Sequence, residues 1–252
     1  MNTRRLQDRV AVVTGASRGL GRAIALALGR EGVRLVLAAR NRQELVAVAG
    51  EVKAAGGQAE AVRCDVTCEA EVALLTETVV GCFGAVHILV NSAGVNVRKP
   101  VTEFSLAEWR QVLDTNLTGV FLMCRALVPL MKGQRYGRIL NLTSIMSHVA
   151  LPGRAAYAAS KAGLLGFTKA LALELAEEGI TVNGISPGPV ATAMNKPILE
   201  NPQAYEQFLA RLPVRRWASE EEITGLALYL CAPEAGFITG TDVVIDGGCT
   251  AQ

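Results

Sequence analysis

Hydrophobic runs alternate with longer amphipathic segments along almost the whole chain. Short aliphatic runs predict strands near residues 10–14, 34–40, 59–64, 87–91, 137–143, 180–186 and 242–246. Between them, apolar residues recur at helical spacing over residues 22–30, 43–55, 69–83, 105–131 and 155–178. Strands that alternate with helices in this way form parallel sheets joined by crossover helices. The pattern therefore predicts an α/β fold, a doubly wound three-layer sandwich with a seven-stranded parallel sheet.

One segment, residues 191–216, interrupts this alternation. It is rich in proline and polar residues, and it follows the sequence "GISPGPV" at the end of a predicted strand. Long insertions are often lids, and ligands of open parallel sheets bind beyond the carboxyl ends of the strands. The segment is predicted to cover a substrate, with a plain surface excursion as the alternative. Because no linker, repeat or charge block divides the chain, residues 1–252 are predicted to form a single domain.

Composition and charge narrow the choice of partners. Half of the 252 residues are hydrophobic, enough for a sizeable core, and 25 basic residues against 23 acidic ones leave a net charge of +2. This balance gives no general reason to expect a nucleic acid or a membrane as partner. The N-terminus has no apolar region suited to a signal peptide, and no apolar run approaches the roughly 18 residues of a membrane span. We therefore expect a cytoplasmic protein.

The cysteines and histidines lack the spacing of a metal site. The six cysteines, at positions 64, 68, 82, 124, 231 and 249, have no CxxC pair and no histidine at ligand spacing. Buried free thiols in a reducing compartment are expected, and no metal. His87 begins a predicted buried strand, whereas His148 lies beyond another strand and could line a pocket.

The sequence "TGASRGLG" directly follows the first predicted strand. Gly15, Gly19 and Gly21 allow positive φ angles and remove Cβ atoms, so a phosphate can approach the amide groups at the start of the next helix. The spacing GxxxGxG differs from the GxGxxG of the common dinucleotide motif, and a tight strand-to-helix turn is the alternative. The loop is predicted to bind a pyrophosphate.

The end of the second predicted strand, "LVLAAR", indicates which dinucleotide binds. Sites that prefer NAD usually carry an acidic residue there for the ribose 2'-hydroxyl, and an acid would repel the 2'-phosphate of NADP. Ala38 and Ala39 leave room instead, and Arg40 can form charge-assisted bonds with that phosphate. Arg18, inside the glycine loop, supplies a second cation. The two arginines together predict NADP(H), the alternative being that both are merely solvated.

The sequence "YAASK" spaces Tyr157 and Lys161 four apart, which puts both side chains on one face of a helix. At a separation of about 4 Å and an effective dielectric of about 20, the cation would favour the phenolate by about 4 kcal/mol. The pKa of the tyrosine would then fall from about 10 toward neutrality, where a general acid or base works best. Ser144 ends the strand pattern "RILNLTS" upstream, where its hydroxyl could bond a substrate oxygen in the same crevice.

Over almost its full length the chain resembles the short-chain dehydrogenase/reductase family, which has a Rossmann-like fold. "TGASRGLG" is similar to the family's cofactor loop, "CDV" to its adenine-contacting pair, and "NSAG" to its NNAG element with Ser92 in place of the second asparagine. "SPGPVAT" resembles its nicotinamide-side loop and "ITGTDVVIDGG" its C-terminal strand. Asn116, Ser144, Tyr157 and Lys161 match its catalytic tetrad.

The resemblance implies a set of cofactor-binding residues: Gly15, Ser17, Arg18, Gly19, Leu20, Gly21, Arg40, Asp65, Val66, Asn91, Ala93, Gly94, Tyr157, Lys161, Pro187, Gly188, Val190 and Thr192. It also implies hydride transfer between nicotinamide C4 and a carbonyl or carbinol carbon, with no metal. Tyr157 would give or take the oxygen-bound proton, and Ser144 would polarise the substrate oxygen. Lys161 would lower the pKa of the tyrosine and hold the nicotinamide ribose. Asn116 would position a water that links the lysine to solvent.

Two substrate classes fit this resemblance. The stretches "AGVNVRKPVTEF" and "LPVRRWASEEEITG" and the ending "DGGCTAQ" resemble gluconate 5-dehydrogenases, which favours a sugar acid or polyol. Arg98 and Arg154 could then hold a substrate carboxylate, and His148 could line the pocket. The alternative is a 3-oxoacyl-acyl-carrier-protein reductase of fatty acid synthesis, in which basic residues such as Arg125, Lys132 and Arg135 would meet an acidic carrier protein.

A third hypothesis is a nucleotide-binding regulator on the same fold without catalysis. All four tetrad positions are filled in this chain, which argues against it. The apolar segments 105–131 and 155–178 and the C-terminal strand resemble the family's subunit contacts, so the resemblance implies a homotetramer. The physiological substrate, the direction of the reaction and its stereochemistry do not follow from the sequence.

Overall fold

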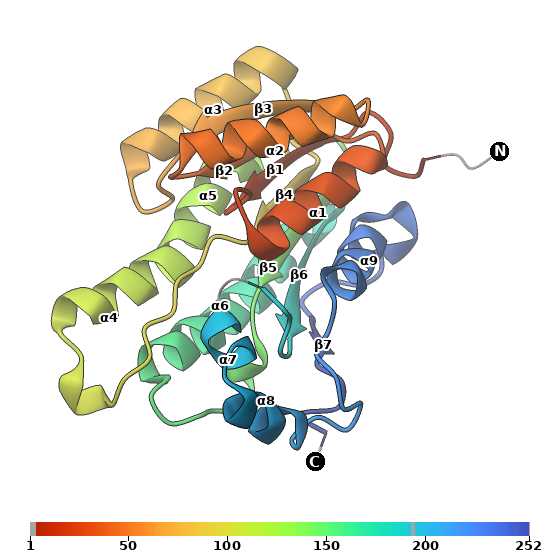
Figure 1. The fold of residues 1–252 in the computed structure, drawn as a ribbon. Coiled ribbons are helices and arrows are strands. Elements are labelled where there is room, and N and C mark those ends of the chain that lie inside the picture. The colour runs from red at the N-terminus through yellow and green to blue at the C-terminus, as the bar shows by residue number, and fades with distance from the viewer. Residues whose placement is uncertain (1–3, 193–194, 252) are drawn as a thin grey trace.

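A computed structural model describes residues 4–192 and 195–251 of the chain. Its centre is a parallel sheet of seven strands, within the described residues, in the order β3-β2-β1-β4-β5-β6-β7 (Figure 1). The strands are β1 (Val10–Thr14), β2 (Arg34–Ala39), β3 (Gln58–Arg63), β4 (Ile88–Asn91), β5 (Gly137–Leu142), β6 (Ile180–Pro187) and β7 (Asp242–Ile245). The predicted strands are confirmed, each end within one residue. The strand order reverses between β1 and β4, which creates the crevice where such sheets bind ligands.

Helices cover both faces of the sheet and enclose two hydrophobic cores. One core lies under α1 (Gly19–Arg30), α2 (Arg42–Ala54) and α9 (Glu220–Cys231), and the other under α3 (Glu69–Phe83), α5 (Gly119–Leu127) and α6 (Ala155–Leu175) (Figure 1). The three-layer, Rossmann-like α/β fold predicted from the sequence is thereby confirmed. Because strands of this sheet are covered on both faces, most of them read as continuous apolar runs.

The helical segment predicted over residues 105–131 is interrupted. It divides into α4 (Leu106–Leu113), a π-helical turn (Asp114–Thr118), α5, and a 3-10 turn (Val128–Leu130). Ser105 begins the segment with a capping box, since its hydroxyl accepts from the amide of Glu108 and the glutamate bonds back. π-Helical turns often mark functional sites, and this one carries Asn116.

The segment 191–216 leaves the end of β6 and returns beside it. Two short helices follow, α7 (Lys196–Leu199) and α8 (Pro202–Leu209), and Figure 1 shows α7 to the left of the lower end of β6 and α8 below it. The Trp217 ring stacks on that of Tyr205, with 6.0 Å between centroids, and packs against that of Phe208 at 5.4 Å. These aromatic contacts hold the segment close to the carboxyl edge of the sheet.

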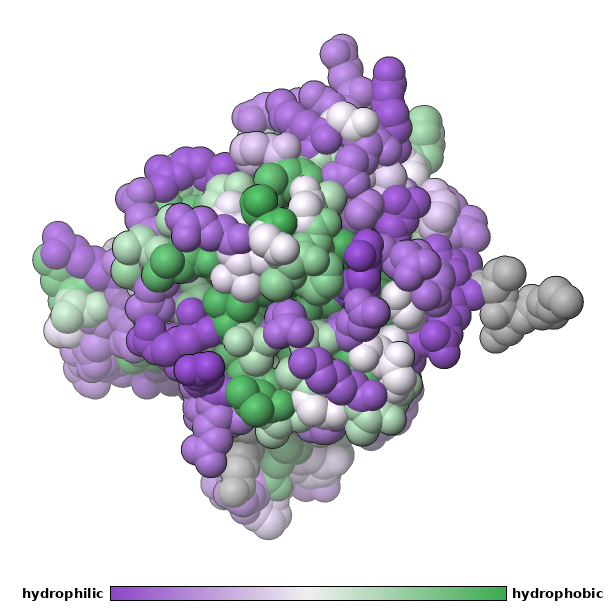
Figure 2. All heavy atoms as spheres, turned by 90° about the horizontal axis from the view of Figure 1, so that it is seen from above, coloured by the Kyte–Doolittle hydropathy of each residue, from purple (hydrophilic) through white to green (hydrophobic). Residues whose placement is uncertain are grey.

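The surface mixes hydrophilic and hydrophobic side chains. Figure 2 shows one face on which hydrophilic residues dominate the rim and hydrophobic ones gather toward the centre. Against the sequence-based expectation, one stretch of the described residues, Leu106–Leu130, is long and apolar enough by length and composition to cross a membrane. Half of its most apolar 18-residue window is buried inside the protein, as in a core helix.

The expected burial of the cysteines is only partly correct. All six thiols are free, and Cys64, Cys124 and Cys231 are buried. Burial raises the pKa of each of these three to about 12, which keeps them protonated and unreactive. Cys82, by contrast, is exposed near the end of α3.

Candidate active site

The glycine loop joins β1 to α1 at the carboxyl edge of the sheet. Gly15 and Gly19 have φ angles of +64° and +55°, which disfavour residues with a Cβ atom. A Cβ on Gly15 would lie 2.8 Å from the backbone nitrogen of Ala93, whereas one on Gly19 would meet nothing within 4 Å. Helix α1 starts with no side-chain cap, so its first amides remain available to an anion. This geometry fits the predicted pyrophosphate.

Thr14 ties this loop to the end of β4. Its hydroxyl accepts from the backbone amides of Ser92 and Ala93, at 3.0 and 3.1 Å. The predicted residues Asn91, Ala93 and Gly94 are thereby brought beside the glycine loop. Thr14 was not among the predicted site residues, although its place at the end of the first strand pattern could have indicated it.

The two predicted phosphate-binding arginines follow neighbouring strands. Arg18 follows β1 and Arg40 follows β2, and these strands pair in parallel with Thr14 opposite Ala38. Both side chains are exposed. Burial raises the pKa of Asp65, but hydrogen bonds from Thr67 and the charge of Arg40 outweigh it and leave that pKa below its ordinary value. Arg40 therefore lies near Asp65, one of the predicted adenine contacts.

The other predicted cofactor residues lie along the same edge. Ser17 is half-buried in the loop, and Leu20 packs from α1 against the core. Val66 is buried against Gly119. Pro187 ends β6, and Gly188, Val190 and Thr192 follow it.

Ser144, Tyr157 and Lys161 come together where β5 ends and α6 begins. Ser144 and Lys161 are 9% and 5% exposed. The Lys161 ammonium nitrogen lies 5.6 Å from the centre of the Tyr157 ring and donates to the carbonyl oxygen of Leu142 at 2.5 Å. The Ser144 side chain lies close enough to Tyr157 to influence the pKa of the phenol. The structure thus brings three of the four predicted catalytic residues into one cluster.

The electrostatics of the cluster differ from the sequence-based expectation. Burial raises the pKa of Tyr157, and it is opposed by the Ser144 hydrogen bond and by the charges of Arg154 and Arg98. Lys161 is itself buried, which lowers its pKa to about 8. Its ammonium faces the Leu142 carbonyl. The sequence-based expectation considered only the spacing of the two side chains along the helix, and it therefore overestimated how far Lys161 lowers the pKa of Tyr157.

Asn116 holds the loop after β4 in place. Its side-chain oxygen accepts from the amide of Val95 at 2.8 Å, and its nitrogen donates to the Val95 carbonyl and to the Ser160 hydroxyl, each at 3.0 Å. It also lies beside the lysine, because a Cβ on Gly94 would be 3.3 Å from its oxygen and 3.9 Å from the Lys161 nitrogen. The fourth predicted catalytic residue therefore joins the cluster.

Arg98 and Arg154 lie on two loops that are bonded to each other. The amide of Lys99 donates to the carbonyl of Gly153 at 3.2 Å. Arg98 also donates to the Asn195 side chain at 3.2 Å, which links it to the segment 191–216. Burial lowers the pKa of Arg154, and the positive charge of Arg98 lowers it further. Both positive charges also lie close enough to Tyr157 to lower its pKa.

The sequence-based reasoning missed an acidic residue near this cluster. His148 does not stand alone, since its Nε2 lies 2.6 Å from the carboxylate of Asp242 in β7. His87 is structural: its Nδ1 accepts from the amide of Val10 at 3.0 Å, and burial lowers its pKa.

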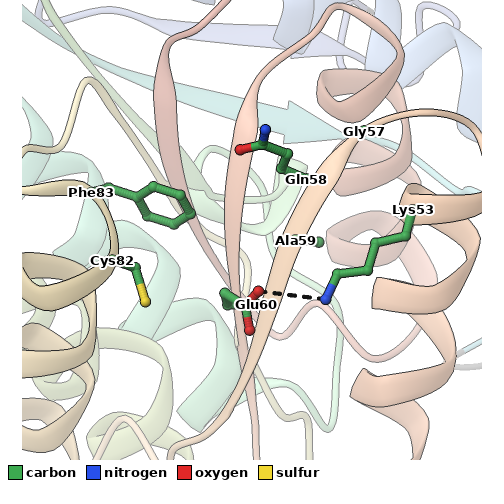
Figure 3. A pocket seen from close by; sticks show the side chains of 7 residues that line it. All are labelled: Lys53, Gly57, Gln58, Ala59, Glu60, Cys82 and Phe83. Carbon is green, nitrogen blue, oxygen red and sulfur yellow. Dashed lines mark hydrogen bonds and ion pairs between the residues drawn. The ribbon is translucent and has the colours of Figure 1, made fainter.

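A surface recess elsewhere contains none of the predicted site residues. It lies at the start of β3 and is lined by Lys53, Gly57, Gln58, Ala59, Glu60, Cys82 and Phe83 (Figure 3). Lys53 and Glu60 pair across it at 3.4 Å. Gln58 begins β3, so the recess is at the amino end of the strand, whereas the residues described above gather at the carboxyl ends.

Known proteins resemble this chain over nearly its whole length. A family profile described as Enoyl-(Acyl carrier protein) reductase matches residues 15–250. The 3-oxoacyl-[acyl-carrier-protein] reductase of Synechocystis is 42% identical over 245 residues, which cover 96% of this chain and 97% of that protein.

Solved structures also match this chain over nearly its whole length. A gluconate 5-dehydrogenase from Burkholderia cenocepacia, in complex with NADP and tartrate, has a TM-score of 0.95 at 31% identity and covers 100% of this chain and 98% of that one. A short-chain type dehydrogenase/reductase from Mycobacterium marinum has a TM-score of 0.94 at 35% identity, with coverages of 100% and 99%.

The fold and the cluster at its carboxyl edge define a nucleotide-binding oxidoreductase of the α/β class. The chain belongs to the short-chain dehydrogenase/reductase family, whose enzymes interconvert carbonyl and CH–OH groups of small molecules.

Proposed function

We propose that the protein is an NADP(H)-dependent enzyme that interconverts a ketone and a secondary alcohol on a sugar acid or polyol. The observation that carries the substrate class is the convergence of Arg98 and Arg154 next to Tyr157. No ion pair of Arg154 occurs among the described residues, and the guanidinium is half-buried. A substrate carboxylate would offset this buried positive charge.

The cofactor follows from the glycine loop and the second strand. The open helix start after Arg18 suits a pyrophosphate, and Arg40 with Arg18 suits a 2'-phosphate, since no acidic side chain ends β2. The Burkholderia relative that binds NADP supports this choice. The nicotinamide dinucleotide, when bound, supplies or accepts a hydride at the substrate carbon.

The chain's own residues handle the proton. In ketone reduction, Tyr157 donates its phenolic proton to the substrate oxygen while Ser144 hydrogen-bonds the same oxygen. Lys161, with a pKa of about 8, can exchange a proton with solvent near neutral pH and so reprotonate the tyrosine. Asn116 fixes the loop at Val95 from the π-helical turn, and a water bound near it would link the lysine to solvent.

The segment 191–216 serves as the substrate cover. Its contact with Arg98 through Asn195 connects the cover to the carboxylate-binding arginines. Residues 193–194 of this segment lie outside the described residues. With this cover, the chain forms one dinucleotide-binding domain.

The second candidate is a 3-oxoacyl-acyl-carrier-protein reductase, favoured by the name of the Synechocystis relative. A carrier protein is acidic and would need unpaired basic residues. Arg125 instead pairs with Glu69 at 2.5 Å and Lys132 with Glu178 at 3.7 Å. These pairs weaken the positive field that was expected to attract such a carrier.

We further propose that the protein is a cytoplasmic homotetramer, and several exposed apolar side chains support the association of subunits. They include Val101, Leu106, Phe121, Leu173, Phe237 and Val244, which lie near α4, α5, α6 and β7. Burying such side chains between subunits removes them from water. Light scattering after gel filtration measures the mass; a monomer at micromolar concentration would contradict this assembly.

The function is tested by one activity panel. Purified protein is assayed with gluconate, 5-ketogluconate and a 3-oxoacyl thioester, each with NADP(H) and NAD(H). We expect the largest kcat/KM with the gluconate pair and NADP(H). A larger kcat/KM with the thioester would favour the second candidate. No turnover of any carbonyl or alcohol would favour the non-catalytic regulator.

A further inference from the structure

Asp242 is an almost completely buried acid at the edge of the active site. It begins β7, the outermost strand beside β6 (Figure 1), and its side chain is 3% exposed. Its carboxylate accepts from the Thr143 hydroxyl at 2.5 Å and the Ser186 hydroxyl at 2.5 Å, and its third neighbour is the His148 Nε2 at 2.6 Å. A buried charge persists only when it is paired and hydrogen-bonded, so these three contacts explain its burial.

The contacts also fix the positions of protons. An ionised carboxylate only accepts hydrogen bonds, so Nε2 of His148 carries a proton. Each hydroxyl has one proton to donate, and each gives it to the carboxylate. The 3.0 Å approach of the Thr143 and Ser186 oxygens is then a consequence of their shared acceptor.

Sheet register explains why these residues meet. Gly184 of β6 lies opposite both Asn141 of β5 and Asp242 of β7. Two residues further along the chain, Thr143 and Ser186 point to the same face, because side chains alternate along a strand. A Cβ atom on Gly184 would lie 2.0 Å from the Asp242 carboxylate oxygen. The glycine therefore leaves the space that the carboxylate fills.

Each partner of Asp242 adjoins a proposed functional segment. Thr143 directly precedes Ser144, Ser186 directly precedes Pro187 of the nicotinamide-side loop, and His148 lies on the loop that follows Ser144. We propose that Asp242 is a positioning residue, which holds Ser144 at a fixed place relative to the nicotinamide-side loop and fixes the ring of His148. The proposal rests on the proposed role of Ser144 in the reaction.

The charge of Asp242 adds a second effect on the cluster. Burial lowers the pKa of Lys161, and the negative charge of Asp242 opposes this change. The carboxylate thus helps to keep the lysine protonated while it aligns the serine.

Asp242→Asn tests the proposal, because asparagine keeps the shape but replaces one acceptor oxygen by an NH2 group. The assay is NADPH-dependent reduction of 5-ketogluconate or of a 3-oxoacyl thioester, whichever the wild type reduces. We expect kcat to fall about 10- to 100-fold, as for a small misplacement of reacting groups, while the dissociation constant of NADPH, from fluorescence titration, changes less than about threefold.

A double-mutant cycle separates positioning from general structural damage. Residues that act as a unit have non-additive effects. In a Ser144→Ala background, Asp242→Asn should therefore lower kcat by less than about threefold. Gly184→Ala, which displaces the carboxylate and keeps its charge, should reproduce the loss of kcat if the asparagine variant does not fold. Glu178→Gln, which removes a carboxylate from a remote surface pair, is the control with unchanged kcat.

Two results would overturn the proposal: a kcat for Asp242→Asn within about twofold of wild type, or an equal loss with and without Ser144. If Ser144→Ala itself leaves kcat unchanged, the proposed function of the serine fails first. The two failures are therefore distinguishable.

Discussion

The Lys161 ammonium donates a 2.5 Å hydrogen bond to the carbonyl oxygen of Leu142, the last residue of β5. The bond joins α6 to the strand that also leads to Ser144, so one contact positions two proposed catalytic groups. It also gives a buried cation a strong acceptor, which a lysine at 5% exposure requires. The buried place that this bond gives to Lys161 is also what lowers its pKa.

That linkage predicts how stability depends on pH. The pKa of Lys161 is about 8 in the folded protein and near 10.4 in an unfolded chain. Between these values the unfolded chain binds a proton that the folded protein has released, so the free energy of unfolding rises with pH. Replacement by Lys161→Met should remove this contribution, about 3 kcal/mol at most.

Urea unfolding without cofactor at pH 7 and pH 10 gives the change in the free energy of unfolding for the wild type and for Lys161→Met. Subtracting one change from the other cancels the titration of the groups that both proteins share. Lys169→Met, an exposed lysine on the same helix, should follow the wild type. Equal pH dependence of wild type and Lys161→Met would show that the lysine is not desolvated as described.

Tyr157→Phe removes the proposed proton donor and keeps the ring. We expect kcat to fall by about 10² to 10⁴, the usual contribution of a general acid, with unchanged folding by circular dichroism. The exposed Tyr229 on α9 offers a matched control, and Tyr229→Phe should keep full activity. A Tyr157→Phe enzyme with wild-type kcat would eliminate the tyrosine as proton donor.

Arg40→Asp tests the cofactor preference. The acid would repel a 2'-phosphate and could accept from a ribose hydroxyl, so KM for NADPH should rise at least about tenfold and NADH use should improve. Steady-state kinetics with both cofactors measure the change. Arg30→Asp, at the end of α1, is the charge-matched control. Unchanged NADPH kinetics would exclude Arg40 from phosphate binding.

Arg154→Gln should weaken binding of carboxylate substrates specifically. Loss of a charge-assisted bond predicts a rise in KM of about tenfold or more for 5-ketogluconate, with little change for an uncharged ketone. Arg154→Lys should keep part of the affinity. If both substrates are affected equally, the arginine does not select the carboxylate.

The same variant should move the pH profile. The charge of Arg154 lowers the pKa of Tyr157, so its removal raises that pKa. Reduction needs the protonated phenol, and the alkaline limb of kcat/KM for reduction of an uncharged ketone should shift to higher pH. A shift to lower pH would contradict the proposed role of the tyrosine as acid.

Prediction from the sequence was accurate where the signal is local. Short runs of apolar residues identified the strands, because both faces of a parallel sheet are buried and each strand therefore appears in the sequence as an apolar run. It failed at the centre of residues 105–131, where the π-helical turn around Asn116 interrupts the helix. An apolar helical period continues through such a turn, so the sequence pattern does not record it.

The sequence by itself determined the α/β fold, the glycine loop and the pairing of Tyr157 with Lys161 on one helix face, since each depends on neighbours within a few residues. Only the tertiary structure decided which charges surround them. Asp242 accepts a hydrogen bond from Thr143, 99 positions away in the chain, and Arg98 lies close enough to Arg154 on another loop to lower its pKa. Such contacts depend on strand register and loop packing, and these set the burial that fixes the proton affinities of Tyr157 and Lys161.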